Sequence, residues 1–448
     1  MANYIPNTRE EVQEMLQAIG VKTVDDLFAE IPPELRLQRD LNIPKGVSEL
    51  EMTRKLAELA NKNQTVDENV CFLGGGAYDH IVPAVIDHIL LRGDFFTAYT
   101  PYQPEVSQGT LQAIYEFQSL ICSLTGMDQA NASMYEGASA TAEAINMAAS
   151  HTRRRKVLVL QSVHPEYRRV INTLNGALGI ELINVPYEDG SIDPTKVAEF
   201  ISKDVAAVVM QYPNFFGCIE DIERISELAH ENGALAIVIA NPVALGLIEA
   251  PGNLGADIVV GEGQPLGVPL SFGGPYVGFM AATKALLRRM PGRIAGRTVD
   301  VDGKRGFVLT LQAREQHIRR EKASSNICSN QALLALNATI YMSLLGKHGI
   351  REVAYQSFQK AHYMKRELGE IKGVSFPFTG SFFNEFVIKI PNARKVVSKM
   401  AKAGIFAGIH LDNYFSTLKD HVLVAVTEKR TKGEIDNYIE TMGGLING

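Results

Sequence analysis

The sequence predicts an α/β protein built around a mainly parallel sheet. Two patterns indicate this fold class. From about Val157 onward, short β-branched runs alternate with amphipathic segments, and most of the runs are continuously apolar instead of alternating with polar residues. Continuous apolar strands are typical of a sheet that helices cover on both faces. The 448 residues are about three times the commonest domain size, so we expect one large domain with smaller additions.

The predicted sheet strands share runs of Val, Ile, Leu and Ala, at 157–160, 180–185, 205–210, 235–240 and 258–260. Amphipathic segments predicted as helices connect them, at 166–178, 194–202 and 221–232. The longest apolar stretch, 234–248, is interrupted by Asn241 and Pro242 and is shorter than the ~20 residues of a membrane-spanning helix. We therefore interpret it as a buried strand and the turn that follows.

A second α/β set follows a long helix predicted near 330–345. Its strands and helices are predicted at 385–390, 393–403, 405–409, 422–426 and 431–442. We accordingly divide the chain into an N-terminal helical arm (1–65), a large α/β domain (66–329) and a small C-terminal α/β domain (330–448).

Capping boxes mark the helix starts of the arm. A Ser or Thr is followed three residues later by a carboxylate, and apolar residues at helical spacing come next. The pairs in the arm are Thr8 with Glu11, Thr23 with Asp26, and Ser48 with Glu51, and a fourth pair, Thr431 with Glu434, opens the last helix. Such an arm packs on a partner subunit or on its own domain, and the sequence leaves both open.

The composition excludes several classes of partner and compartment. Lys and Arg number 44 against 50 Asp and Glu, a net charge of −6, so no basic surface for nucleic acid or anionic lipid is predicted. The acidic start of the chain fits neither a secretory signal nor a transit peptide. The cysteines are far apart without a CxxC pair, at Cys71, Cys122, Cys218 and Cys328. This pattern predicts reduced thiols in a cytoplasmic protein.

A glycine-rich run and two Asp-His pairs resemble a nucleotide site and a metal site, but their details do not support either. The run 261–267 looks like a dinucleotide loop, but Pro265 and Pro269 would break the helix such a loop must open. The pairs Asp79-His80 and Asp87-His88 would lie ~12 Å apart on one helix, too far for one metal ion. We interpret these pairs as first-turn carboxylates and surface histidines.

Two further features remain open between a binding and a structural role. The small-residue turn from Gly137 to Thr141 could present backbone N–H groups to a phosphate at a helix N-terminus, or could allow close helix–sheet packing. His164 follows the strand 157–160, where open α/β sheets place ligand contacts. A histidine there is alternatively a structural residue with its hydrogen bonds satisfied.

Three segments carry a resemblance to one family. They are Thr-Pro-Tyr-Gln-Pro-Glu-Val-Ser-Gln-Gly at 100–109, Asn-Ala-Ser-Met at 131–134, and Leu-Gln-Ala-Arg-Glu-Gln-His-Ile-Arg-Arg-Glu-Lys-Ala-Ser-Ser-Asn-Ile-Cys at 311–328. Together they resemble the N-terminal half of the glycine cleavage system P-protein, a glycine decarboxylase dependent on pyridoxal 5'-phosphate (PLP). The resemblance runs from the arm to the C-terminal domain. It implies the PLP-dependent transferase fold type I, which is aspartate-aminotransferase-like, and the alpha subunit of the form that is split into two chains.

This sequence departs from the catalytic pattern of that family. A PLP enzyme needs a lysine for the Schiff base and an acid at the ring nitrogen. In the catalytic half, the lysine precedes a proline and a Gly-Gly-Pro turn, and here Gln264 stands at its position before 268–275. No lysine occurs between Lys203 and Lys284, and the strand 235–240 carries no aspartate. We therefore expect a partner beta subunit to hold the PLP.

The resemblance also suggests which residues line the shared site. The candidates for lining it are Tyr99, Thr100, Tyr102, Gln103 and His164. The first four lie on a short proline-bounded loop and could hydrogen-bond a carboxylate or a lipoyl arm, or could form a rigid contact between subunits. The run 314–322 is basic with interleaved acids, and its composition alone predicts a solvated helix face. The resemblance instead favours an interface for Arg314, His317, Arg319 and Arg320.

The implied function is that of a subunit of glycine dehydrogenase (decarboxylating). With its beta subunit, in an α2β2 assembly, it would decarboxylate glycine on PLP and transfer the aminomethyl group to the lipoyl group of H-protein. Two alternatives remain. One is a self-sufficient PLP lyase or transferase that uses another lysine, such as Lys284 or Lys304. The other is a purely structural scaffold subunit.

Overall fold

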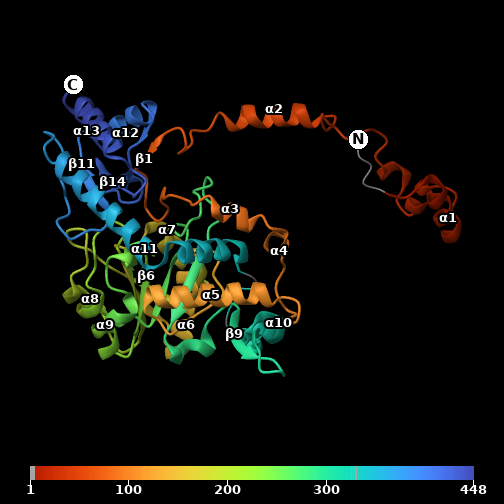
Figure 1. Ribbon diagram of the computed structural model, residues 1–448, viewed down its shortest axis with the longest axis horizontal. Coiled ribbons are helices and arrows are strands. Elements are labelled where there is room, and N and C mark those ends of the chain that lie inside the picture. The colour runs from red at the N-terminus through yellow and green to blue at the C-terminus, as the bar shows by residue number, and fades with distance from the viewer. Residues whose placement is uncertain (1–5, 324, 326, 328–329) are drawn as a thin grey trace. The chain divides into compact units, whose positions relative to one another are not determined.

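The computed structural model describes residues 6–323, 325, 327 and 330–448 (Figure 1). The chain divides into two compact units, Met1–Gln64 and Thr65–Gly448. The further division into domains 66–329 and 330–448 stays a prediction. Among the cysteines, Cys71, Cys122 and Cys218 are free thiols, as predicted, and Cys328 lies outside the described residues.

The first unit consists of short helices and turns. Its α-helices are α1 (Arg9–Ile19) and α2 (Glu49–Ala60), and two 3-10 turns, Val24–Phe28 and Pro33–Leu35, lie between them. All three predicted capping boxes are present, which confirms where these segments begin. Helix α2 is amphipathic but contains no buried residue. The described part of this unit therefore has little hydrophobic core of its own.

The second unit contains a seven-stranded sheet with the order β2-β8-β7-β6-β5-β3-β4. The strands of this sheet are β2 (Gln129–Ala130), β3 (Lys156–Leu160), β4 (Glu181–Val185), β5 (Val205–Tyr212), β6 (Leu235–Ala240), β7 (Ile258–Glu262) and β8 (Gly278–Ala282). The five from β7 to β4 run parallel, and β8 and β2 are antiparallel to their neighbours. These five parallel strands are the five that the sequence predicts, with ends shifted by at most two residues.

Helices pack against this sheet, and all but the first of them lie in the connections between its strands. They are α5 (Gln108–Thr125), α6 (Gly137–Thr152), α7 (Pro165–Gly176), α8 (Pro194–Phe200) and α9 (Ile222–Glu231). Helix α6 contacts β5 to β8, and α9 contacts β5 and β6. Strands β5 and β6 bury nearly every residue, which confirms the inference of a covered sheet from continuous apolar runs. No helix among the described residues is long and apolar enough to cross a membrane.

The remaining α-helices and strands come before or after the sheet segment in the sequence and form smaller structures. The helices are α3 (Val85–Leu90), α4 (Gly93–Phe96), α10 (Gln316–Arg319), α11 (Ala332–Leu368), α12 (Ala393–Lys402) and α13 (Lys432–Asn447). The strands are β1 (Val70–Cys71), β9 (Ile294–Val299), β10 (Arg305–Thr310), β11 (Glu385–Lys389), β12 (Ile405–Phe406), β13 (Ile409–His410) and β14 (His421–Ala425). Strands β9 and β10 form a hairpin, and β11, β14 and β13 form an antiparallel sheet.

One predicted strand is wrong in the C-terminal region. The apolar run 405–409 is two separate strands, because β12 pairs with β1 whereas β13 pairs with β14. Gly408 lies between them with φ of 135°, a conformation that favours glycine. A Cβ at this position would also lie 2.4 Å from the carbonyl oxygen of Leu423. The glycine thus lets the chain turn from one sheet to the other.

Candidate functional site

A small cavity lies where parallel strands of the large sheet end. Open α/β sheets place ligand contacts at this edge. The lining comes from β5, β6 and β7, from the turns after them, and from segments far away in sequence: Gly76, Tyr78, His164, Tyr167, Gln211, Pro213, Ile239, Ala240, Asn241, Pro242, Glu262, Pro265, Asn384 and Glu385. The cavity measures about 30 Å³, which is room for about two water molecules. Among the described lining residues there are two carboxylic acids and neither lysine nor arginine.

Gln264 follows β7 next to this cavity and is only 1% exposed. Its Oε1 accepts a hydrogen bond from the backbone N–H of Tyr78 at 2.8 Å. Its Nε2 donates to the carbonyl oxygens of Tyr78 at 3.0 Å and Val268 at 2.7 Å. Both amide protons are therefore used, and the side chain acts as a cross-link between the turn after β7 and the segment after β1.

His164 also lines the cavity, as the N-cap of α7. Its Nδ1 accepts from the backbone N–H of Glu166 at 3.0 Å, so Nε2, 2.6 Å from the carbonyl oxygen of Gly75, carries the proton and donates. Burial lowers the pKa of this imidazole to about 4, because desolvation disfavours the charged form. The ring packs edge-on against Phe215 with centroids 4.7 Å apart. His164 is thus neutral, with both ring nitrogens satisfied.

The N-terminus of α6 is occupied by carboxylates of the chain itself. The first free N–H groups of a helix are the donors that would hold a phosphate. Here Glu136 accepts from Ala138 N–H at 2.5 Å and from Ser139 N–H at 2.8 Å. Glu262 accepts from Gly137 N–H at 3.1 Å. All three donors of this turn are therefore already bonded to side-chain carboxyl groups of the chain itself.

Gly137 is required at this helix end by packing. A Cβ there would lie 2.1 Å from the Tyr167 hydroxyl and 3.0 Å from the backbone nitrogen of Glu262, closer than van der Waals contact permits. Of the two interpretations that the sequence left open for this turn, the close approach of helix and sheet agrees with the geometry.

The two acids of the cavity differ from surface carboxylates. Glu262 also accepts from the N–H groups of Gln264 at 3.1 Å and Val277 at 3.2 Å, yet burial raises its pKa to about 8. Glu385 accepts from Gly75 N–H at 2.7 Å and from the Tyr78 hydroxyl at 2.6 Å, and burial raises its pKa to about 7. The cavity thus holds two acids that retain a proton more readily than surface carboxylates do, and no lysine or arginine among its described lining residues offers a positive charge to an anionic ligand.

One sequence-based interpretation near this site is wrong. Asp79 and His80 are not on a helix with the second Asp-His pair, and they are not surface residues, since both are buried. Asp79 pairs with Lys429 at 2.7 Å and Arg430 at 2.9 Å, and His80 Nδ1 lies 2.5 Å from Glu428. These contacts connect the segment after β1 to the turn after β14. The second pair, on α3, is exposed as expected.

The loop predicted to line a shared site lies elsewhere in the second unit. Tyr99 is 86% exposed and Tyr102 is 48% exposed. The Tyr102 hydroxyl oxygen accepts a hydrogen bond from Arg293 Nη2 at 2.9 Å. Tyr99 and Thr100 line a groove of about 310 Å³ between α4, α5 and the start of α11. Gln103 is exposed. Within this chain, the loop and His164 therefore line separate cavities.

The basic run 314–322 is mostly short turns, so the expected helix face is only the four residues of α10. Arg314 departs from that expectation, because its guanidinium donates to the carbonyl oxygens of Met290, Gly292 and Leu311, and burial lowers its pKa. Arg319 donates to the carbonyl oxygen of Ala313 at 3.1 Å.

Other members of the run are more exposed. His317 is exposed and lies 3.7 Å from Glu315, and Arg320 is exposed as well. Residues 324, 326 and 328 of the motif lie outside the described residues.

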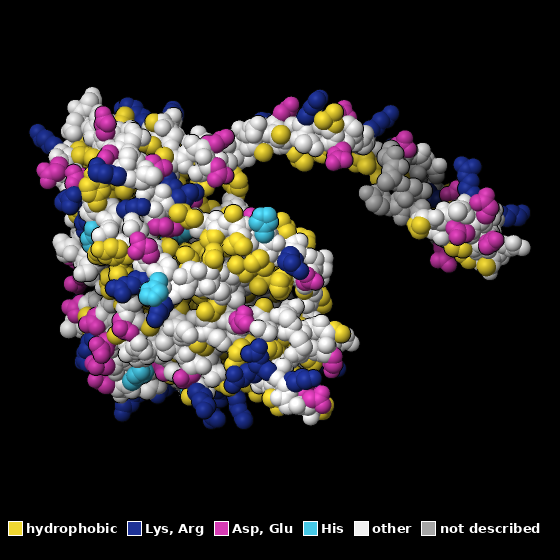
Figure 2. Space-filling model, in the orientation of Figure 1, with side chains coloured by type: hydrophobic (Ala, Val, Ile, Leu, Met, Phe, Trp, Pro, Cys, Tyr) yellow, Lys and Arg dark blue, Asp and Glu magenta, His cyan; other side chains and the backbone are white. Residues whose placement is uncertain are grey.

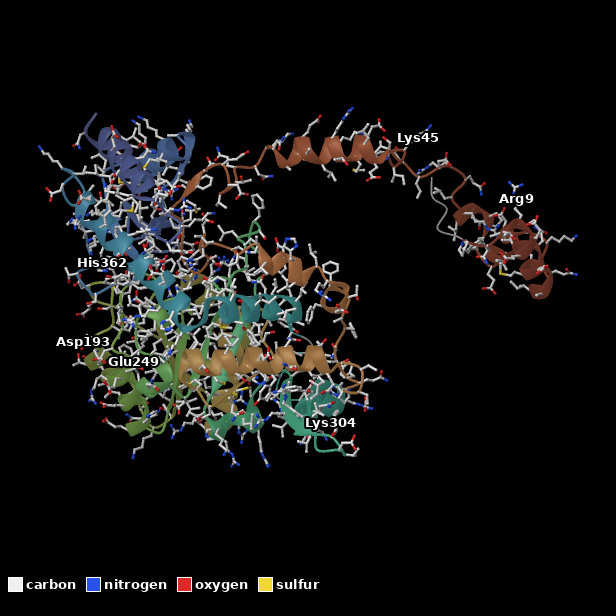
Figure 3. The ribbon with its side chains drawn as sticks, in the orientation of Figure 1. Arg9, Lys45, Asp193, Glu249, Lys304 and His362 are labelled. Carbon is white, nitrogen blue, oxygen red and sulfur yellow. The ribbon has the colours of Figure 1, made fainter. Side chains whose placement is uncertain are left out.

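The two lysines considered as alternative anchors lie at the surface. Lys284 is exposed at the start of the 3-10 helix Lys284–Arg289. Lys304 lies on the turn between β9 and β10, with its side chain 78% exposed (Figure 3). Neither lines the cavity at the strand ends.

Comparison with known proteins supports one family along nearly the whole chain. The sequence model described as "Glycine cleavage system P-protein" matches residues 2–442. The chain is 54% identical over 442 residues to the "Probable glycine dehydrogenase (decarboxylating) subunit 1" of Carboxydothermus hydrogenoformans, covering 98% of this chain and 99% of the relative. It is 53% identical to the protein of the same name from Geobacillus kaustophilus, covering 98% of each.

Solved structures agree in fold. A crystal structure of glycine decarboxylase (P-protein) of the glycine cleavage system in inhibitor-bound form superimposes with a TM-score of 0.91 at 42% identity, covering 99% of this chain and 100% of that one. A glutamate decarboxylase from Lactobacillus brevis superimposes with a TM-score of 0.69 at 11% identity, covering 92% and 96%. The predicted PLP-dependent fold type I is thereby confirmed, and the chain belongs to the glycine cleavage system P-protein family.

Proposed function

We propose that this chain is the alpha subunit of a cytoplasmic glycine decarboxylase and does not itself anchor PLP. It acts with a PLP-bearing beta subunit, in an α2β2 assembly, to decarboxylate glycine and pass the aminomethyl group to the lipoyl group of H-protein. The name "subunit 1" of its relatives supports a second subunit. The observation that carries the proposal is the buried amide of Gln264 at the lysine position, with both of its protons bonded to backbone carbonyl oxygens.

The residues present do not fit PLP. The cofactor requires a lysine amine, N–H donors for its phosphate and an acid at its ring nitrogen. Gln264 replaces the amine, and Glu136 and Glu262 occupy the helix N–H groups. The acid is missing as well, because β6 carries no aspartate. Asn241, which follows β6, instead caps the next turn by accepting a hydrogen bond from Val243 N–H at 3.0 Å. We therefore assign no step of the reaction to this cavity and regard it as a structural cavity that does not bind the cofactor.

We propose that this chain contributes to the complete enzyme through the surface around the loop 99–103. Large apolar side chains there are exposed, among them Leu91, Phe96 and Val106. Figure 2 shows hydrophobic side chains gathered over α3, α4 and the start of α11. Exposed apolar side chains that gather in one patch are typical of a protein–protein interface. We infer that the beta subunit covers it and that the loop completes the site on that subunit.

In this arrangement the loop supplies hydrogen-bonding groups and excludes water. The hydroxyl groups of Tyr99, Thr100 and Tyr102 and the amide of Gln103 can bind the carboxylate of glycine or the amide of the lipoyl arm. Binding and orientation of this kind lower a reaction barrier without a catalytic acid or base. The apolar surroundings would keep bulk water away from the reacting carbon.

Substitution of the tyrosines tests this proposal against the structural scaffold. We expect Y99F and Y102F, in the chain reconstituted with its beta subunit, to slow glycine-dependent CO2 exchange. Since a hydrogen bond to a charged group contributes about 1.5–3 kcal/mol, the expected loss is roughly tenfold or more. Tyr355→Phe, a substitution of a tyrosine exposed on α11, is the matched control. Unaltered exchange and unaltered H-protein affinity in Y99F and Y102F would favour the scaffold.

A further inference from the structure

A buried arginine stands behind the loop. Arg293 is only 4% exposed and immediately precedes β9. Its backbone is fixed, because its carbonyl oxygen accepts from Ala132 N–H at 2.8 Å. Its Nη2 donates to the Tyr102 hydroxyl oxygen at 2.9 Å, and the guanidinium carbon lies 5.4 Å from the centre of the tyrosine ring. The guanidinium thus holds one end of an otherwise exposed side chain.

The direction of this hydrogen bond decides what the tyrosine can do. A guanidinium has donors and no acceptor, whereas a phenol has one proton and lone pairs that accept. Because Arg293 donates to it, the Tyr102 hydroxyl cannot direct its own proton at the guanidinium. The proton must point to another partner, and the side chain is 48% exposed. The hydroxyl is therefore available to donate to a ligand or a partner chain.

Glu315 is the charge partner of Arg293, but its carboxylate lies too far away to replace the hydrogen bond to Tyr102. Glu315 Oε2 lies 3.9 Å from Arg293 Nε and 3.7 Å from His317 Nδ1. Among the described residues, Arg293 Nε and Glu315 Oε1 are buried without a hydrogen-bond partner. A purely structural ion pair gains most from direct contact, because incomplete pairing leaves a desolvation cost. The guanidinium instead directs a donor to the loop.

We propose that Arg293 is a positioning residue that fixes Tyr102 with its hydroxyl proton directed toward the substrate-bearing interface. This inference rests on the proposed function, since it takes the loop to complete the site of the beta subunit. In this role Arg293 acts through Tyr102, although it also lines the groove beside Tyr99 and Thr100. The ring of His317 lies edge-on to that of Tyr102, with the ring centroids 6.1 Å apart.

The positioning role is tested in the free full-length chain by hydrogen–deuterium exchange of the peptide 97–107. Loss of the arginine in R293M removes the hydrogen bond to Tyr102, so the loop amides should exchange roughly tenfold faster or more. R305M is the matched control, because Arg305 is an exposed arginine on β10, in the hairpin that follows Arg293, with its guanidinium 5.8 Å from the Phe307 ring. Loop exchange that is unchanged in R293M would overturn the positioning role.

Coupling between the two residues is tested in the reconstituted enzyme with Y102F, R293M and the double variant. If Arg293 acts through Tyr102, the double variant should lose no more kcat/KM than the more impaired single variant. Losses that multiply would overturn the proposal. R293K keeps a donor with a shorter reach and should restore part of the activity, so the test does not depend on R293M alone.

The two readouts separate this inference from the function on which it rests. Faster loop exchange in R293M together with full activity of Y102F would overturn the assignment of the loop to the shared site. Unchanged loop exchange together with a loss of activity in Y102F would leave that assignment standing and overturn the role of Arg293. Thermal unfolding followed by circular dichroism confirms that each variant is folded.

Discussion

Glu385→Gln should remove a pH dependence of stability that the wild-type chain carries. The carboxyl accepts from Gly75 N–H and from the Tyr78 hydroxyl. A glutamine can keep both contacts, because its carbonyl oxygen can accept from Gly75 and its NH2 group can donate to the Tyr78 oxygen. The substitution therefore changes the titration of this position and leaves its shape and hydrogen bonds nearly intact.

The magnitude follows from the pKa of Glu385, which burial raises from 4.5 to about 7. A raised pKa means that the folded chain holds this proton more tightly than the unfolded chain does. The associated stability is fully present below pH 4.5 and is lost as the pH rises through about 7. At 1.36 kcal/mol per pKa unit, the loss amounts to about 3 kcal/mol.

The assay is urea unfolding between pH 5 and pH 8.5, followed by far-ultraviolet circular dichroism because the chain has no tryptophan. The contribution of Glu262, whose pKa is also raised, cancels in the difference between wild type and E385Q. Relative to wild type, the unfolding free energy of E385Q should rise by about 3 kcal/mol across this range. The control E370Q, at an exposed glutamate, should run parallel to wild type. A parallel course for E385Q would refute the reasoning.

Three further substitutions test the packing and charges around the cavity by thermal and urea unfolding. Q264K should remove three buried hydrogen bonds and bury an ammonium group, lowering the unfolding free energy by roughly 3 kcal/mol. It should still incorporate no PLP, and a cofactor bound by this single variant would contradict the fit argument. G137A should cost about 1–3 kcal/mol through overpacking, whereas G109A on α5, where a Cβ meets nothing within 4 Å, should cost none, and equal effects would contradict the packing argument. D79N should cost about 3–5 kcal/mol because it leaves two cations without their buried partner, and the exposed control D94N less than about 1 kcal/mol; a small effect of D79N would show that this cluster is not needed for folding.

The sequence predicted the parallel part of the sheet because two-sided burial imposes a local pattern. Strands β5 and β6 are continuous apolar runs, so burial alone identifies them. Strand β8 was missed because Gly-Phe-Met-Ala-Ala lacks β-branched residues. The hairpin of β9 and β10 was missed because its strands are polar and partly exposed. Each strand is defined by its pairing with the other and not by a local apolar pattern.

The candidate site could be predicted only where a single segment carries it. Gln264 was found because the frame of the following proline and glycines resembles the family. Glu385 had no such signal, since its partner Gly75 is 310 residues away, and only the fold brings them together. The bond between Tyr102 and Arg293 spans 191 residues and was missed for the same reason. Glu136 could have been found as an acid just before a small-residue helix start.

The burial of His80 was likewise not predictable from its neighbours in sequence. Its partner Glu428 is 348 residues away and belongs to the C-terminal part of the chain. An Asp-His pair is more often found at a surface than buried, and its neighbours in the sequence do not include the charged partners that allow its burial. Ion pairs between distant segments are a property of the assembled fold.

The most direct measurement locates the covalent bond to the cofactor. The chain is purified alone and together with its beta subunit, incubated with PLP, reduced with borohydride and digested for peptide mapping. We predict that every pyridoxyl-lysine maps to the beta subunit and that the chain alone neither retains a reduced adduct nor exchanges CO2 with glycine. A pyridoxyl-lysine on this chain, together with glycine decarboxylation by this chain alone, would contradict the account.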